Sequence, residues 1–274
     1  MIIDESQLKA ARKIVSAADA VILVAGAGMS AAGGVLPTFR DNEGFWRHYP
    51  GLKGRSFFTV ASLNSFYDDH SATLGFYMHR KVLYRDTMPS EAYRLSLALV
   101  EQKPMKGVLV TTNVDGHAQR AGFANVWEVH GSINEWHCAS VNCTKYRKVV
   151  ELDVPVDSEF IASVNSSCFC DCGQPIRPSI MLFDDIGYQP LSYAMQKSVF
   201  DQYFVSLQEK KAKVCVIEVG CGNAVPTQRI NSGRYSKIFS TKVIRINKEK
   251  ESDSDDFLNL TGVDAVKALS SLLG

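Results

Sequence analysis

The stretch VILVAGAGMSAAGGVLPTFR, residues 21–40, decides the fold that we expect for this chain. Its apolar start at residues 21–25 predicts a buried strand, and Gly26 and Gly28 follow immediately. Small residues and glycines then continue to Gly34 and predict the start of a helix. A strand that runs into glycines and a helix start lets the backbone approach a phosphate, because exposed N–H groups and the helix dipole favour negative charge there. The stretch therefore predicts a nucleotide-binding turn.

The dinucleotide fingerprint G-x-G-x-x-G is incomplete in this stretch. Ala31 stands where the third glycine belongs, although the fingerprint tolerates alanine there. No strand that ends in an acidic residue stands at the expected distance, since Asp41 and Glu43 belong to a polar loop. On this segment alone, a tight strand-to-helix turn of any α/β protein is the alternative interpretation.

The composition predicts a large core and gives no electrostatic reason for a polyanionic partner. A chain of 274 residues with 46% hydrophobic content can form one large domain, or a domain with an inserted lobe. The net charge of +1 gives no electrostatic argument for nucleic acid or an anionic membrane, so we expect neither as a partner. No apolar run reaches the ~20 residues that span a bilayer, and the first residues lack the basic-then-apolar order of a secretory signal. We therefore expect a soluble, cytoplasmic protein.

Further short blocks follow in order along the chain. They are TTNVDG at 111–116, RAG at 120–122, VHG at 129–131, a cysteine module that ends at 172–173, RP at 177–178, FDD at 183–185, GCG at 220–222 and IN at 246–247. Together with GAGMS and PTFR, they resemble the sirtuin family, the NAD-dependent protein deacylases, over roughly residues 15–270. Several ordered blocks are much more specific than any one of them.

The resemblance implies an α/β fold with a doubly wound, mainly parallel, Rossmann-like sheet and a smaller zinc-binding and helical lobe. We expect one sirtuin-type catalytic domain over residues 1–274. Its large NAD-binding lobe would take about 1–48, 92–136 and 175–274. The small lobe would take the helical segment at about 49–91 and the zinc module at about 137–174. NAD would lie across the carboxyl ends of the strands.

Three polar residues are the candidate catalytic group. Asn113 and Asp115 follow a second apolar run, and the carboxyl end of a parallel strand is where an open sheet places its ligand crevice. The resemblance gives them the nicotinamide amide and the ribose hydroxyls. His130 follows a short strand, and the resemblance makes it the base that takes a ribose proton, which suits a group that titrates near neutral pH. A structural role is the alternative for a lone histidine.

The resemblance implies a longer set of cofactor contacts: Gly26, Ala27, Gly28, Ser30, Phe39, Arg40, Thr112, Asn113, Asp115, His130, Gly220, Cys221, Gly222, Asn247 and Asp264. This chain departs from the family in several of these places. Thr112 stands where the family has glutamine, and His117 with Ala118 replaces Leu-His. Gly-Cys-Gly at 220–222 replaces Gly-Thr-Ser, so two hydroxyl contacts are lost, and Ser232 is a candidate replacement.

Five of the seven cysteines lie within residues 138–172, which suggests a metal site before disulfides. Two thiolate pairs from separate loops can make a closed tetrahedral zinc site. Cys138 and Cys143 form one pair, and Cys172 belongs to the other. Either Cys168 or Cys170 completes it, and we favour Cys168 because the C-x3-C spacing gives more room. The resemblance makes this zinc structural, and free thiols without metal are the alternative.

The substrate candidates come from two segments. Tyr77 and Arg80 stand three residues apart on a predicted helix, and a phenol beside a guanidinium can hold a carboxylate. They resemble the pair with which some sirtuins bind succinyl or malonyl groups, and a tyrosine packed beside a solvated arginine is the alternative. Met181 and Phe183 belong to a segment that we predict to be extended, 180–183, and its family counterpart pairs with the substrate peptide. Asp184 replaces the family glycine there.

The hypothesis is an NAD-dependent protein-lysine deacylase, an enzyme that transfers the acyl group of a modified lysine to ADP-ribose and releases nicotinamide. Acetyl, succinyl and malonyl groups are the candidate substrates. An ADP-ribosyltransferase or NAD-hydrolysing enzyme on the same scaffold is one alternative, suggested by the departures at 112, 184 and 220–222. A non-catalytic NAD-binding module is the other, because the blocks most closely tied to binding are kept. Protein or peptide partners therefore depend on an acylated lysine.

Overall fold

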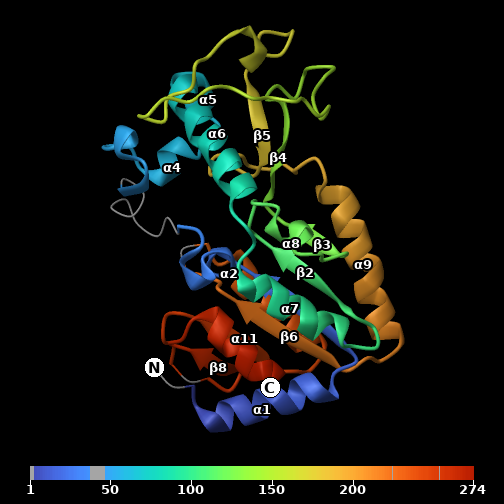
Figure 1. Cartoon of the computed structure of the whole chain (residues 1–274). Helices are drawn as coiled ribbons and strands as arrows, with labels where there is room; N and C mark the ends of the chain where they lie inside the picture. Colours follow the sequence, from blue (N-terminus) through green and yellow to red (C-terminus); the bar gives the residue numbers. More distant parts are fainter. Residues whose placement is uncertain (1–2, 38–46, 224, 253) are drawn as a thin grey trace.

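The computed structural model describes residues 3–37, 47–223, 225–252 and 254–274 (Figure 1). The strands are β1 Ala20–Ala25, β2 Gly107–Thr111, β3 Val126–Glu128, β4 Gly131–Cys138, β5 Ile176–Ile180, β6 Val214–Val219, β7 Val243–Asn247 and β8 Phe257–Thr261. The longer helices are α1 Glu5–Ala17, α6 His70–Asp86, α7 Glu91–Glu101, α9 Tyr193–Glu209, α10 Thr227–Ile238 and α11 Ala265–Leu273. The short helical turns are α2 Ala27–Ser30, η1 Ala32–Gly34, η2 Pro50–Leu52, α4 Phe57–Val60, α5 Ser65–Asp68, α8 His117–Arg120 and η3 Ser166–Cys168.

The main sheet has six parallel strands in the order β3-β2-β1-β6-β7-β8. β1 lies between β2 and β6, with Val21 beside Gly107 on one side and beside Cys215 on the other. The chain builds outward from β1 to β3 and later returns to the opposite side of β1 through β6. This reversal of strand order leaves a crevice at the carboxyl ends of β1 and β6, where open α/β sheets bind ligands.

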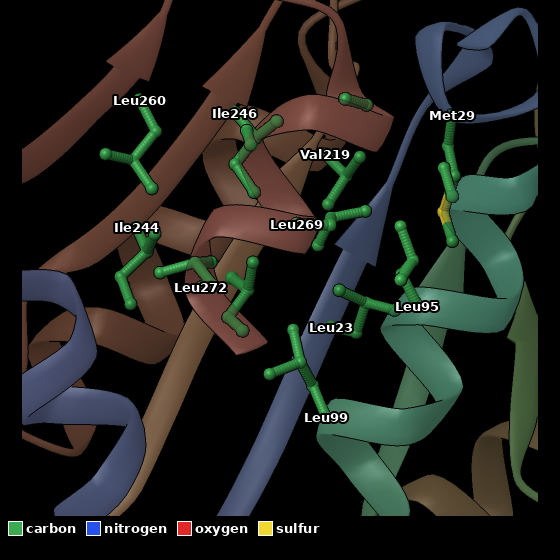
Figure 2. Close-up of a cluster of buried hydrophobic side chains, with 14 of the residues drawn as sticks. Leu23, Met29, Leu95, Leu99, Val219, Ile244, Ile246, Leu260, Leu269 and Leu272 are labelled. Carbon is green, nitrogen blue, oxygen red and sulfur yellow. The ribbon is translucent and has the colours of Figure 1, made fainter. Parts of the chain in front are cut away.

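Helices cover both faces of this sheet (Figure 1). One face packs against α1, α7 and α11, and Leu23, Leu99 and Leu269 lie together in that core (Figure 2). The other face packs against α9 and α10, with Ile22 and Phe200 among its buried side chains. Successive residues of β1 enter opposite cores because side chains alternate along a strand. A strand buried on both faces is apolar throughout, which explains the continuous run in the sequence. The predicted doubly wound, mainly parallel sheet is confirmed.

A second core lies beside the main sheet. β4 and β5 pair antiparallel, and α6 packs against β4. Trp136 of β4 is fully buried there with Phe76 of α6 and Leu52. The predicted boundaries of the two lobes stay a prediction. The second core draws mainly on residues 49–84 and 133–182. It agrees with the predicted helical segment at 49–91, and it extends beyond the predicted zinc module at 137–174 into residues that were assigned to the large lobe.

The strand predicted at residues 21–25 is confirmed as β1, Ala20–Ala25. The Asp4 carboxylate caps the amino end of α1, where it accepts from the backbone N–H groups of Ser6 and Gln7. The prediction of an extended segment at 180–183 is wrong for most of its length, because the strand β5 already ends at Ile180. Beyond it the chain makes single backbone bonds and turns. Within the described residues, no helix combines the length and the apolar character needed to cross a membrane.

Candidate functional site

A cavity of about 650 Å3 lies at the carboxyl ends of β1, β2 and β6. The predicted site residues in its wall are Gly26, Ala27, Gly28, Ser30, Tyr77, Arg80, Thr112, Asn113, Asp115, His130, Met181, Phe183, Gly220, Cys221, Gly222 and Asn247. The structure therefore brings together residues that are up to about 220 positions apart in the chain. Phe39 and Arg40, two predicted cofactor contacts, lie outside the described residues.

Three glycines let two backbone segments cross at the floor of this cavity. The N–H of Gly28 donates to the carbonyl oxygen of Gly220 at 2.9 Å. A Cβ on Gly26 would lie 2.7 Å from that oxygen, and a Cβ on Gly28 would lie 2.7 Å from the Gly220 Cα. Gly220 itself has a φ of +65°, a conformation that favours glycine. The glycines of the first turn are thus required by their contact with a second turn, after β6.

A buried polar network orients the two predicted residues that follow β2. Asn113 Nδ2 donates to Gly26 O at 3.0 Å and to Ser30 Oγ at 2.9 Å. Ser30 Oγ donates to Asp115 Oδ2 at 2.6 Å, and it also lies 2.8 Å from the Tyr93 hydroxyl. Tyr93 accepts from Asn113 Nδ2 at 3.1 Å and is fully buried. The network fixes the amide and the carboxylate at the cavity wall, so both are preorganised for a polar ligand.

Tyr93 is a site residue that the sequence analysis missed. It belongs to α7, where its buried neighbours Ala92 and Leu95 suggest only a core position. Burial raises the pKa of its phenol well above the ordinary value, so it is a neutral hydrogen-bonding group at neutral pH. A tyrosine among buried residues near a helix start was the available signal, since a buried phenol usually has a polar partner.

His130 lies directly after β3 and its side chain is partly buried in the cavity wall. Burial lowers the pKa of its imidazole from 6.5 to about 4. The ring is therefore neutral at neutral pH and can accept a proton. Its backbone oxygen accepts the N–H of Met181 at 2.9 Å, which ties the base to the segment after β5.

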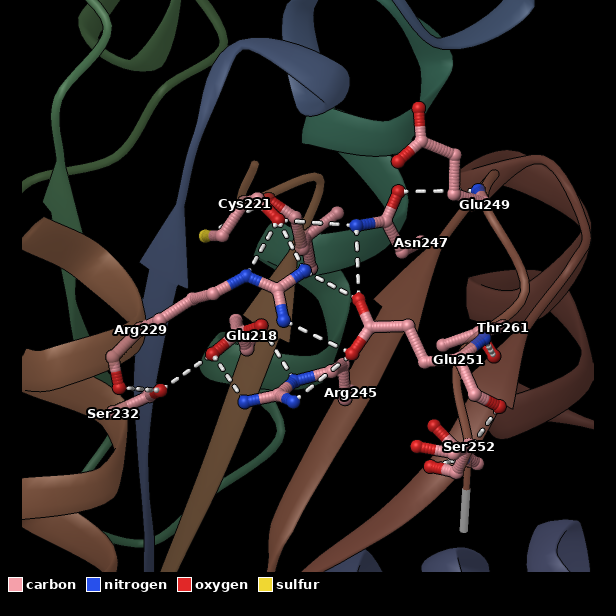
Figure 3. A network of polar contacts seen from close by, with 12 residues as sticks. Glu218, Cys221, Arg229, Ser232, Arg245, Asn247, Glu249, Glu251, Ser252 and Thr261 are labelled. Atoms are coloured by element: carbon pink, nitrogen blue, oxygen red, sulfur yellow. Dashed lines mark hydrogen bonds and ion pairs between the residues drawn. The ribbon is translucent and has the colours of Figure 1, made fainter. Parts of the chain in front are cut away.

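The far end of the cavity is shaped by backbone held in a charged network (Figure 3). The carbonyl oxygen of Cys221 accepts from Arg229 Nη2 at 2.7 Å and from Asn247 Nδ2 at 3.0 Å. The Cys221 thiol points into the core, 3.8 Å from Val24 O. Asn247 lies in the cavity wall as predicted, while its Nδ2 is engaged by this carbonyl.

Ser232 does not replace the hydroxyl groups missing from Gly-Cys-Gly. Its Oγ donates to the buried carboxylate of Glu218 and lies outside the cavity wall. Asp264 also lies outside the wall, and its predicted cofactor contact is not supported. Its carboxylate caps α11 by accepting from Val266 N at 2.9 Å, and it accepts from Gly33 N at 3.2 Å. An aspartate before a helix is more simply a cap.

Tyr77 and Arg80 line the cavity from α6, as the helical spacing predicts. Both side chains are buried, so Arg80 is not a solvated surface arginine. Tyr84, one turn further along α6, lines the same cavity and was missed by the sequence analysis. The rings of Phe76, Tyr77 and Tyr84 surround the Arg80 guanidinium at 5.1, 5.8 and 5.2 Å from their centroids.

The segment after β5 forms one edge of the cavity mouth. Met181 and Phe183 are exposed in part, and the Phe183 ring lies 4.4 Å from that of Phe58. The N–H of Phe183 donates to Ala61 O at 3.1 Å. Asp184 accepts from the backbone N–H groups at the start of α5, so its carboxylate has a capping role.

Four cysteines form one compact cluster: Cys138, Cys143, Cys170 and Cys172. Their sulfur atoms all lie within 4.8 Å of one another, with 3.6 Å between Cys138 and Cys172 and between Cys143 and Cys170. Zn–S bonds of about 2.3 Å in a tetrahedron place sulfurs about 3.8 Å apart. The donor set and its spacing therefore fit Zn2+. Cys170 belongs to the cluster, so our preference for Cys168 was wrong.

Cys168 does not belong to the metal cluster, because its side chain packs into the second core. It lies at the end of η3, fully buried in the second core, and its sulfur accepts from Asn165 N at 3.4 Å. Cys170 and Cys172 instead flank one turn that faces the other pair. His137, next to Cys138, is also outside the cluster: its ring nitrogens lie 2.7 Å from Cys138 O and from the Tyr188 hydroxyl.

Comparisons with known proteins agree with this geometry. The model of the Sir2 family matches residues 26–207. An NAD-dependent protein deacetylase of Shouchella clausii is 31% identical over 191 residues, which cover 69% of this chain and 72% of that protein. Another, from Saccharolobus solfataricus, is 33% identical over 194 residues, 70% of this chain and 72% of that protein.

A shorter match and a structural match extend this picture. The NAD-dependent protein deacylase sirtuin-5, mitochondrial, of Danio rerio is 35% identical over 139 residues, 49% of this chain and 43% of that protein. Among solved structures, a Sir2 homologue in complex with NAD aligns with a TM-score of 0.66 at 23% identity, and the alignment covers 99% of this chain and 93% of the other. On the family match and these relatives, the chain belongs to the Sir2 family.

Proposed function

We propose that this protein is an NAD-dependent protein-lysine deacylase. The observation that carries the proposal is the meeting of the glycine turn, the Asn113–Asp115 network and the His130 imidazole around one cavity. Relatives that carry the name NAD-dependent protein deacetylase over some 70% of this chain support it. The activity is the transfer of a lysine acyl group to ADP-ribose with release of nicotinamide.

The residues of the cavity would divide the work as follows. The backbone of the glycine turn at 26–28 and the Cys221–Asn247 edge would hold the dinucleotide, since both line the cavity with backbone or amide groups. Bound NAD supplies the ribose carbon that receives the acyl oxygen as nicotinamide leaves. Asn113 and Asp115 would orient the nicotinamide end. His130, neutral at neutral pH because burial lowers its pKa, would take the proton of a ribose hydroxyl.

We further propose that acyl groups with a terminal carboxylate are among the substrates. Arg80 is the only lysine or arginine among the described residues that line the cavity. Its burial makes a charge interaction stronger than it would be in water, and Tyr77 lies beside it. The acylated lysine itself would enter past Met181 and Phe183, whose exposed side chains edge the mouth. An extended peptide could pair there with main-chain groups.

The four-thiolate site would hold a structural zinc. It ties the loop at 138–143 to the loop at 170–172. The metal would therefore stabilise the small lobe rather than take part in the reaction. Thiolates that must stay reduced favour a reducing compartment, which supports our proposal of a cytoplasmic protein.

The test is a panel of peptides that carry acetyl-, malonyl- or succinyl-lysine, incubated with purified protein and NAD and analysed by mass. We expect nicotinamide, deacylated peptide and acyl-ADP-ribose in equal amounts. ADP-ribose attached to protein or released into water without an acylated peptide would favour the alternative activities. His130→Ala should abolish turnover while calorimetry still detects NAD binding. No turnover of any peptide by the unmodified protein would refute the proposal.

A further inference from the structure

Tyr84 has an unusual relation to the buried cation of the cavity. Arg80 donates to the Tyr84 hydroxyl oxygen through Nε at 2.8 Å and through Nη2 at 2.5 Å. The two residues lie one helical turn apart on α6 and are 9% and 8% exposed. Both line the cavity that contains His130. One phenol oxygen therefore accepts two hydrogen bonds from one guanidinium at the cavity wall.

The hydroxyl hydrogen of Tyr84 can be donated to a further acceptor, because the hydroxyl oxygen only accepts from Arg80. A tyrosine hydroxyl has one O–H and two acceptor lone pairs, and Arg80 occupies the acceptor side. Among the described residues, the Tyr84 hydroxyl donates to no acceptor. Burial raises the pKa of Tyr84, so the proton stays on the oxygen at neutral pH. Hydrogen bonds from a cation polarise the O–H group, and a polarised hydroxyl is a stronger donor.

Tyr84 is also held in place through its backbone. Its backbone oxygen accepts from His117 Nε2 at 3.0 Å and from Arg120 Nη1 at 2.7 Å. The N–H of His117 in turn donates to Asp115 Oδ1 at 2.9 Å. His117 is one of the positions where this chain departs from its family, so the departure has a structural role. The end of α6 is thereby fixed to the loop that carries Asp115.

We infer that Tyr84 is a specificity-determining residue that donates its hydroxyl hydrogen to the terminal carboxylate of the acyl group. The ligand class is a lysine acylated with a short dicarboxylic acid, such as malonyl or succinyl. Arg80 supplies the charge, and Tyr84 supplies a directed donor oriented by that charge. A neutral acetyl group offers no acceptor at this place. The inference rests on the proposed function for the identity of the ligand.

The test compares binding rather than turnover, so that it does not depend on catalysis. The dissociation constants of a succinyl-lysine peptide, its methyl ester and the acetyl-lysine peptide are measured by calorimetry. Tyr84→Phe keeps the ring beside Arg80 and removes only the hydroxyl. A hydrogen bond to a charged group contributes enough for a loss of about tenfold or more. We expect that loss for the succinyl peptide alone. Tyr67→Phe, which alters a half-exposed tyrosine of α5, is the matched control.

The outcomes separate the inference from the proposed function. In the unmodified protein, the methyl ester should bind about tenfold more weakly than the free acid, and Tyr84→Phe should narrow this difference. Equal losses for the succinyl and acetyl peptides would show a structural role and overturn the inference, as would no loss at all. Thermal unfolding confirms that the variant is folded. Turnover without succinyl selectivity would overturn the inference alone, whereas selective binding without turnover would overturn only the deacylase proposal.

Discussion

Replacing Gly220 by alanine should damage both the stability of the protein and its dinucleotide turn. The new Cβ would lie 2.4 Å from Gly28 C and 2.4 Å from Met29 N, and these are backbone atoms that no side-chain rotation can move. Ordinary contact needs about 1 Å more. The positive φ of +65° adds about 1–2 kcal/mol for a residue with a Cβ, and overpacking adds about 1–3 kcal/mol. We therefore expect Gly220→Ala to lower the free energy of unfolding by about 2–5 kcal/mol.

Thermal unfolding by calorimetry measures this loss, which for a domain of this size lowers Tm by on the order of 10 °C. Gly222→Ala is the matched control for stability, since no described atom lies within 4 Å of its added Cβ. It lies two residues away in the same loop and should change Tm by about 1 °C or less. The affinity of Gly220→Ala for NAD should also fall, because the displaced backbone is the glycine turn. Equal Tm values for the two variants would refute the reasoning.

Three further predictions concern the metal, the polar network and pH. Cys170→Ser should lose the zinc measured by elemental analysis, together with stability, whereas Cys168→Ser should keep the zinc; zinc loss from both would contradict the cluster. Tyr93→Phe should lower the free energy of unfolding by about 1–2 kcal/mol, measured by chemical denaturation. It should also reduce kcat, measured by peptide turnover, and an unchanged kcat would show that the polar network has only a structural role. Burial lowers the pKa values of His130 and His137 from 6.5 to about 4, so the unfolded chain binds more protons between these values. Stability should therefore fall as pH decreases from about 6.5 to 4, and a flat denaturation midpoint over this range would contradict it.

The elements around the glycine turn could be predicted from the sequence, because the residue pattern of each strand matches its buried position in the parallel sheet. Residues 21–25 are readable as a strand because a run that is buried on both faces is mostly apolar. Residues 214–219 are readable for the same reason, although this strand also carries the buried carboxylate of Glu218. Asn113 and His130 stand at strand ends, and the carboxyl ends of parallel strands meet at one edge. Order along the chain therefore predicts proximity for these residues without knowledge of the packing.

The remaining site residues could not be predicted, because their roles depend on side-chain orientations and on the path of the chain. Spacing allows either Cys168 or Cys170 to reach the metal, and only the path of the chain after η3 decides between them. Ser232 stands near enough in sequence to replace a lost hydroxyl, yet its hydrogen bond goes to the buried carboxylate of Glu218 on the adjacent strand β6. Tyr84 and Tyr93 were missed because a tyrosine on the buried face of a helix resembles any core residue until its hydroxyl partner is known.

The Gly-Cys-Gly turn at 220–222 is held through its backbone by a charged network. Glu218 is fully buried and Arg245 nearly so, and their ion pair at 2.8 Å continues through Glu251 to Arg229 (Figure 3). Two carboxylates and two guanidinium groups balance in charge, and removal of one would leave an unpaired buried charge that costs about 3–5 kcal/mol. Arg229 can therefore hold the carbonyl of Cys221 firmly. In this chain the far end of the cavity is fixed through the backbone of Cys221, whose carbonyl oxygen the charge network holds. The thiol of Cys221 takes no part in this network and packs in the core, because the network contacts only the backbone of this residue.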